Sequence, residues 1–241
     1  MISPELTVLL IVVCSITYSL EVVFGLAGTV IMIAILNFAF PSKTLVIYSL
    51  LPQILVGSTV LLKSFGTGQF SKIELIKMLS SALAGAIVGS YLFALVPNQL
   101  FTQVLSVVII IVGIYLVVSP SFNIHKRFRL ILDLSAGISH ALFGISGPIV
   151  MTRLMGTFQD KTIIRNNALL FYFGLNMIRM INYISNKMIS PDIWKLYLYS
   201  APVLIPVLFF AEKLHSRISD IKFKKIVAWL ILVSGVIYFI R

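Results

Sequence analysis

Residues 143–148 read FGISGP, and they interrupt an apolar run that extends from 130 to 156. A second interruption, FGLAG at 24–28, lies in the apolar run 6–40. Glycine and proline weaken or end a helix, so each run is expected to form two helical arms joined at a break. Residues 29–40 would reach only about 18 Å as a helix, less than the ~30 Å core of a bilayer. Each run is therefore expected to be a re-entrant hairpin or a pair of short spans.

The composition around these breaks excludes a water-soluble protein. Of the 241 residues, 59% are hydrophobic and 11% are charged, whereas soluble domains have about 45–50% and about 25%. The net charge of +11 would suggest nucleic acid in a soluble protein. In a membrane chain it indicates cytoplasmic loops beside anionic lipid. The single cysteine, Cys14, excludes an intrachain disulfide and a cysteine metal cluster.

Six further apolar segments are long enough to cross a bilayer, which takes roughly 20 residues. They are 44–63, 75–96, 101–119, 162–184, 193–211 and 224–240. The loops between them are short, and few residues remain for an extramembrane domain. The predicted fold is an all-α polytopic membrane protein with a single transmembrane domain, 1–241.

The basic residues predict the orientation of this domain. If both broken runs return to the side on which they began, fourteen Lys and Arg lie on one side and four on the other, with Arg179 inside a span left out. A single crossing by each run would give nine on each side. The positive-inside rule favours the uneven division, with basic loops in the cytoplasm and both termini outside. Two complete crossings per run would give the same sidedness, and the expected location is the cell (inner) membrane.

The chain is predicted to contain an internal repeat. Phe24–Gly28 aligns with Phe143–Gly147 at an offset of 119 residues, and Lys43–Val46 aligns with Lys161–Ile164 at an offset of 118. Each half, 1–120 and 121–241, is then a broken hairpin followed by three spans. Three crossings is an odd number, so the halves form an inverted repeat, an architecture whose substrate sites lie at the midplane. Chance similarity between apolar, glycine-containing runs is the alternative.

The second break has the chemistry of an anion site. A helix that begins inside the membrane presents unpaired N–H groups and a partial positive charge at its N-terminus. Ser146 is the predicted N-cap, Pro148 suits the first turn, and Gly147 lets a ligand approach the backbone. A kink needed only for packing is the alternative. The predicted substrate-binding residues at the two breaks are Gly25, Gly28, Thr29, Gly144, Ser146, Gly147 and Pro148.

Span 162–184 carries a polar stripe on one helical face, formed by Arg165, Tyr172, Asn176, Arg179 and Tyr183. Ionisable groups inside a membrane usually face a cavity, so Asn176 and Arg179 are predicted to bind the substrate from the side. Arg179 lies about one turn from the outer end of the span, and snorkelling to the interface is the alternative. Arg165 is interpreted as a topogenic charge near the cytoplasmic face.

Glu21 and His140 each precede a break, and they are also 119 residues apart. This spacing makes them symmetry mates near the midplane. A carboxylate and an imidazole in a low dielectric can exchange protons at accessible pH, so the pair is the predicted site of proton coupling. A buried histidine satisfied by a backbone carbonyl is the alternative.

One segment is specific enough to indicate a family: GISHALFGISGP at 137–148, followed by Arg165, Asn176 and Arg179. With it the chain resembles the TauE/SafE sulfite-exporter family of membrane permeases over nearly its whole length. In the first half the family's usual dense glycine cluster is reduced, and His140 stands where a small residue is common. The resemblance implies transport of a small anion, often an organosulfur compound, by two related halves.

The predicted function is a secondary transporter of a small anion such as sulfite, a sulfonate or sulfoacetate. The chain has no Walker-type phosphate loop, and neither ATP nor any cofactor or metal is expected. A membrane-embedded enzyme is the rival, but His125, His140 and His215 are scattered in the sequence. A structural membrane subunit is a third possibility. The expected partners are the anion, the bilayer and a coupling proton, and no nucleic acid is expected. The identity of the substrate, the direction of transport and the oligomeric state stay open, and a homodimer is one candidate.

Overall fold

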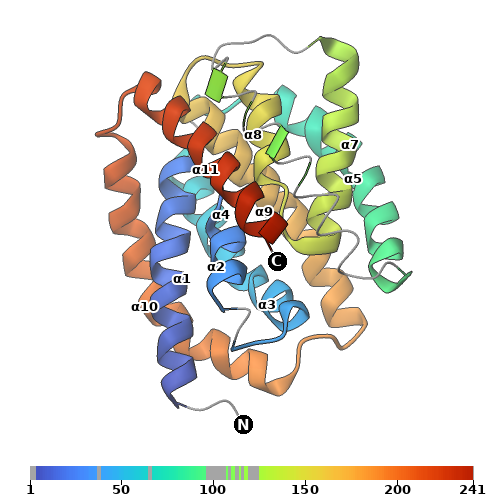
Figure 1. Cartoon of the computed structure of the whole chain (residues 1–241), viewed down its shortest axis with the longest axis vertical. Coiled ribbons are helices and arrows are strands. Elements are labelled where there is room, and N and C mark those ends of the chain that lie inside the picture. Colours follow the sequence, from blue (N-terminus) through green and yellow to red (C-terminus); the bar gives the residue numbers. More distant parts are fainter. Residues whose placement is uncertain are drawn as a thin grey trace.

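A computed structural model describes residues 4–36, 39–64, 67–95 and 125–240, and single residues between 107 and 118. Every regular element in these ranges is an α-helix, as the composition predicts (Figure 1). Apart from those single residues, the predicted span 101–119 lies outside the described part of the chain.

The chain is helical on both sides of each glycine motif and not within it. The four arms are α1 (Pro4–Phe24), α2 (Gly28–Leu36), α7 (Lys126–Phe143) and α8 (Gly147–Met155). Gly25 and Gly144 have φ angles of +77° and +67°, which glycine adopts without the steric cost that a side chain would bring. The two predicted breaks are therefore confirmed as helix ends. α2 and α8 have 9 residues each, or about 13 Å, and neither crosses a bilayer alone.

The remaining helices follow the predicted spans. They are α3 (Ser42–Tyr48), α4 (Leu50–Ser64), α5 (Lys72–Leu95), α9 (Lys161–Ser185), α10 (Pro191–His215) and α11 (Asp220–Ile240). Among the described residues, the stretches long and apolar enough to span a membrane are Pro4–Phe24, Lys43–Ser64, Lys72–Leu92 and Pro191–His215. The chain is thus a multi-pass membrane protein. α3 and α4 are separated at Ser49, because Pro52 has no N–H group to bond the carbonyl of Tyr48.

The starts of the helices recur along the chain with one spacing. α2, α3 and α5 begin 119 residues before α8, α9 and α10 respectively, which is the spacing of the two glycine motifs. The two regions differ in one respect: α9 runs without interruption where α3 and α4 are separate.

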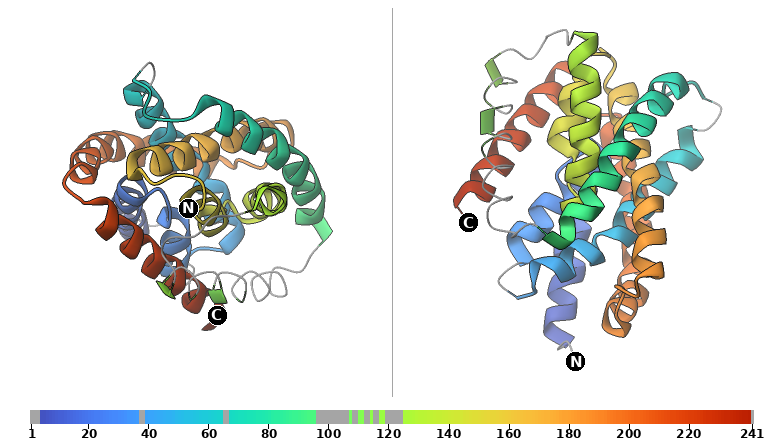
Figure 2. Two further views of the ribbon diagram at one scale, coloured as in Figure 1. Left: turned by 90° about the horizontal axis from the view of Figure 1, so that it is seen from above. Right: turned by 90° about the vertical axis from the view of Figure 1, so that its right-hand side faces the viewer.

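Close packing of α5 against α7 depends on small residues. A Cβ on Gly85 would meet the carbonyl of Leu134, and a Cβ on Gly137 would meet the carbonyl of Ala82. Such contacts bring two backbones together, as small residues do between membrane helices. Figures 1 and 2 show α5 and α7 side by side at one edge of the bundle, α1 and α10 at the other, and α2, α4, α8 and α9 between them. Both breaks are consequently buried in the interior.

Candidate functional site

A small cavity lies between the two breaks. It is lined by Glu21, Leu26, Ala27, Thr29, Val30, Gln53, His140, Gly144, Ile145, Ser146, Gly147 and Tyr172. Eight of these twelve residues form four pairs separated by 119 positions: Glu21 with His140, Leu26 with Ile145, Ala27 with Ser146, and Gln53 with Tyr172. The walls of the cavity therefore come from corresponding positions along the chain.

Most of the residues predicted for the site are brought together here. Those lining the cavity are Glu21, Thr29, His140, Gly144, Ser146 and Gly147. Those buried nearby without lining it are Gly25, Gly28, Pro148, Asn176 and Arg179. Gln53 and Tyr172 complete the polar part of the wall.

Glu21 occupies the N-terminal end of α2. Its carboxylate is hydrogen bonded to the backbone of Gly28 and Thr29, and the residue is 2% exposed. A Cβ on Gly28 would collide with this carboxylate, so glycine is required for Glu21 to reach the helix end. An ionised Glu21 at this place satisfies unpaired N–H groups and the positive end of the helix dipole. The first break thus contains its own hydrogen-bond acceptor.

His140, at the corresponding place before the second break, makes no such contact with α8. Its Nδ1 lies 3.1 Å from the Ser146 hydroxyl, and its Nε2 lies 3.2 Å from Asn176 Oδ1. Both partners are side chains, so the alternative of a backbone carbonyl partner does not apply. Ser146 is the N-cap residue, as predicted, but its side chain makes no capping hydrogen bond. The N-terminus of α8 is left without a side-chain acceptor and borders the cavity at Gly147.

Tyr172 adds a hydroxyl to the cavity beside this helix end. The side chain is 3% exposed, and its hydroxyl has no hydrogen-bond partner. A Cβ on Gly147 would lie 3.7 Å from that hydroxyl, and the tyrosine ring stacks on His140 with centroids 6.0 Å apart. A buried polar group without a partner is costly. A ligand at Gly147 would provide the missing acceptor.

Arg179 is a buried cation without a carboxylate partner. It is 4% exposed, so it does not snorkel to the interface. All eight Asp and Glu residues lie in the described ranges, and none has an oxygen within 4 Å of its guanidinium. Burying a charge is expensive unless an opposite charge accompanies it. The surroundings of Arg179 therefore favour an anion.

Within the described ranges, the oxygens that the guanidinium of Arg179 contacts are all neutral. It donates to Asn176 Oδ1 at 2.9 Å, to the Tyr183 hydroxyl at 3.0 Å and to the Val46 carbonyl at 3.0 Å. A longer bond of 3.4 Å reaches Gln53 Oε1. Two donors, Arg179 Nε and Asn176 Nδ2, have no partner. This part of the site has spare capacity to donate to an oxyanion.

Gln53 connects the two breaks with each other and with Arg179. Its Nε2 donates to Thr29 Oγ1 at 2.8 Å and to the Gly144 carbonyl at 3.1 Å. Its Oε1 is the oxygen that Arg179 contacts. The cavity and the buried cation are thus separated by one amide side chain.

Comparison with known proteins agrees with the geometry. The sequence model described as sulfite exporter TauE/SafE matches residues 9–238, nearly the whole chain. The chain belongs to the TauE/SafE sulfite exporter family. No curated protein and no solved structure matched in the two other comparisons. The TauE/SafE family is a transporter family, which implies a small anionic substrate, and the apolar helices fit a transporter.

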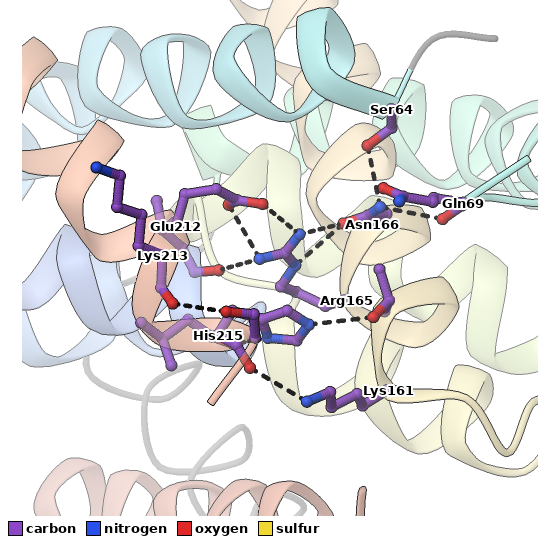
Figure 3. Close-up of polar contacts among 12 residues, drawn as sticks. Ser64, Gln69, Lys161, Arg165, Asn166, Glu212, Lys213 and His215 are labelled. Atoms are coloured by element: carbon purple, nitrogen blue, oxygen red, sulfur yellow. Dashed lines mark hydrogen bonds and ion pairs between the residues drawn. The ribbon is translucent and has the colours of Figure 1, made fainter. Parts of the chain in front are cut away.

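In this TauE/SafE chain, Arg165 is also buried, at 2% exposure, and its topogenic role stays a prediction. Figure 3 shows its guanidinium paired with both carboxylate oxygens of Glu212, at 2.9 and 2.8 Å. It also donates to Asn166 Oδ1 and to the carbonyl of Val22, near the end of α1. Glu212 neutralises the charge of Arg165, and the bonds of Arg165 hold α9 against α10 and α1.

A third buried arginine, Arg153 near the end of α8, is likewise paired. It bonds Asp133 of α7 at 3.2 Å and also bonds Glu74 of α5. These pairs fix the C-terminal end of α8, whose N-terminal end borders the cavity. Of the buried arginines in the described ranges, Arg179 is the one that no carboxylate accompanies. The same ranges contain no group of three His, Cys, Asp or Glu arranged to hold a metal ion.

Proposed function

We propose that this chain is a secondary transporter that carries a small organosulfur anion, such as sulfite or a sulfonate, through the cavity between the two breaks. The observation that carries the proposal is Arg179, a buried cation that lacks a carboxylate and lies one side chain away from the open end of α8. An anion at that helix end would accept hydrogen bonds from the Gly147 N–H and the Tyr172 hydroxyl. Its negative charge would compensate Arg179.

The proposed transport cycle uses two inverted halves, 1–120 and 121–241. The constant spacing of helix starts and the paired walls of the cavity support this arrangement. Rocking of one half against the other would expose a fixed midplane site to each side in turn. The proposed topology places the basic loops in the cytoplasm and both termini outside. Cysteines introduced at Lys72 and Lys126 should react with an impermeant reagent from the same side; reaction from opposite sides would contradict the topology.

Counterflow in proteoliposomes tests the transport activity. The purified protein should exchange labelled sulfite, sulfoacetate, taurine or a small carboxylate across the bilayer. Gly147→Val places a branched side chain at the helix end and should abolish exchange in a protein that still folds. Arg217→Gln, a change at an exposed position, is the matched control and should exchange normally. Absence of exchange with every anion, or full exchange by Gly147→Val, would overturn the proposal.

The proposed coupling ion is a proton carried by Glu21. A bound anion and an ionised Glu21 would place two negative charges in one cavity, where repulsion at about 4 Å is about 4 kcal/mol at an effective dielectric of 20. The titratable groups around Glu21 are Tyr18 on its own helix and His140 and Tyr172 across the cavity, and none is a lysine or arginine. A proton on Glu21 removes the repulsion, so proton and anion should bind cooperatively.

This coupling predicts that anion flux rises as the pH falls, because protonated Glu21 then predominates. Glu21→Gln keeps the shape of the side chain and removes its titration, so its flux should lose the dependence on pH. His140→Ala should weaken the pH dependence of the flux, because it removes the ionisable imidazole on the other side of the cavity. Flux at several pH values under a clamped membrane potential measures both effects. Identical pH profiles for Glu21→Gln and the unmodified protein would refute the coupling while leaving anion transport intact.

A further inference from the structure

The environment of Gln53 fixes the orientation of its amide. One end of the amide faces the Gly144 carbonyl, which can only accept, and Thr29 Oγ1. The other end faces the Arg179 guanidinium, which can only donate. Gln53 is itself buried and lines the cavity. Its amide oxygen is therefore held against the cation, and its amide nitrogen is held against Thr29 and the Gly144 carbonyl.

The bond between Gln53 and Arg179 is the weakest contact of that guanidinium. At 3.4 Å it is longer than an ordinary N–H···O hydrogen bond, and its acceptor is neutral. Charged acceptors form shorter and stronger bonds with arginine, often two at a time. The unpartnered Nε of Arg179 and Nδ2 of Asn176 are buried beside it. An oxyanion would satisfy these donors better than the amide oxygen does.

We propose that Arg179 and Asn176 form a second anion position, and that Gln53 is the residue that separates it from the position at the end of α8. The amide oxygen of Gln53 holds the place that an oxygen of the anion takes on Arg179. When the anion displaces the Gln53 side chain, the bonds from Gln53 Nε2 to Thr29 Oγ1 and to the Gly144 carbonyl also break. Through Gln53, these are the only side-chain hydrogen bonds described that connect the two breaks. Arrival of the anion at Arg179 thereby loosens the connection between the two breaks.

This inference rests on the proposed transport function and narrows its substrate class. An anion at the second position faces unpartnered donors on two residues, Arg179 Nε and Asn176 Nδ2, and needs at least two oxygens to accept from both. Sulfite, sulfonates and carboxylates meet this requirement, whereas a halide has a single atom to offer. We therefore expect oxyanions to bind in preference to halides.

Two substitutions of similar size test the role of Gln53. Gln53→Glu supplies an internal carboxylate to Arg179 and should weaken sulfite binding by more than about tenfold, because like charges then meet. Gln53→Met removes the competing acceptor and should tighten sulfite binding by about threefold, the scale of one hydrogen bond. Titration calorimetry of sulfite into the purified full-length protein measures both. If Gln53→Glu does not fold, Asn176→Asp places the same charge beside Arg179 and should also weaken binding by more than about tenfold.

The outcomes separate this inference from the function on which it rests. If Gln53→Glu weakens sulfite binding and Gln53→Met tightens it, the Gln53 oxygen occupies the place that the anion takes on Arg179. Equal weakening by both would show that Gln53 only ties the two breaks together, and unchanged binding in both would show that the anion never reaches Arg179; either result overturns the inference. If the unmodified protein binds neither sulfite nor the other oxyanions, the proposed function itself fails.

Discussion

Two arginines of α9 lie against the two breaks, but in opposite electrostatic settings. A Cβ on Gly25 would lie 3.3 Å from Arg165, and a Cβ on Gly144 would lie 2.9 Å from Arg179. The two glycines are 119 residues apart, and both have positive φ angles. Glu212 neutralises Arg165, whereas Arg179 has only neutral oxygens around it.

Under the proposed function, the difference separates a structural charge from one that binds the substrate. A bidentate pair satisfies both partners and leaves little attraction for a mobile ion, so Arg165 holds helices together. An arginine without a carboxylate retains its attraction for any anion that reaches it. The same contrast applies to the helix ends: Glu21 fills the end of α2, and the end of α8 is open. The first break is closed by the chain's own groups, and the second is the one that we propose binds the substrate.

Removing the carboxylate from the paired arginine should have the largest effect. Glu212→Gln leaves Arg165 buried without a counter-charge, and we expect a loss of about 3–5 kcal/mol in stability. Thermal unfolding in detergent measures the loss. Asp192→Asn is the control, because Asp192 and Lys195 are half-exposed or more and 4.0 Å apart, and such a pair contributes about 0–1 kcal/mol. Equal effects of the two changes would remove the distinction between the arginines.

Removing the unpaired arginine should act on binding instead of folding. Arg179→Gln eliminates the cation and should reduce the binding free energy of sulfite by about 2–5 kcal/mol. The empty protein should lose less stability than Glu212→Gln does, because no carboxylate loses its partner. Calorimetric titration and thermal unfolding of the same preparation report both quantities. A variant that binds sulfite normally, or that unfolds as easily as Glu212→Gln, would contradict this assignment.

Substitutions of Gly25 and Gly144 should have smaller effects, and they also test whether the two breaks differ. Gly25→Ala and Gly144→Ala each force a side chain into the left-handed region, at about 1–2 kcal/mol. In Gly144→Ala the new Cβ also presses on the Arg179 guanidinium nitrogens, at 2.9 and 3.0 Å, so anion binding should weaken as well. In Gly25→Ala it meets the Cα and Cγ of Arg165, away from the proposed anion site, and binding should change little. Equal binding losses in the two variants would show that the breaks do not differ in function.

The helix breaks could be predicted from the sequence because their cause is local. Two or three helix-weakening residues within five positions favour a break whatever the helix packs against, whereas single glycines such as Gly85 and Gly137 stay inside helices. Repetition of the motif at a fixed offset indicates that both breaks share a form. The stripe on α9 was visible for the same reason, since helical periodicity brings Asn176 and Arg179 to one face. All of its members are buried.

The partners of the buried charges could not be predicted in this way. Glu212 lies on another helix, 47 residues from Arg165, and a single sequence does not say which helices meet. The pairing of Arg153 with Asp133 and Glu74 depends on the same unknown. That Arg179 has no such partner is a property of its three-dimensional neighbours, and no local pattern expresses it.

The position of a bound anion tests the central claim most directly. Selenite resembles sulfite in shape and charge, and its selenium scatters anomalously, so diffraction from crystals grown with selenite locates the ion. We expect an interior anomalous peak bounded by the Gly147 backbone, the Tyr172 hydroxyl and the Arg179 guanidinium. Peaks confined to exposed lysines and arginines, or a peak at Arg165 with the cavity between the breaks empty, would contradict the account.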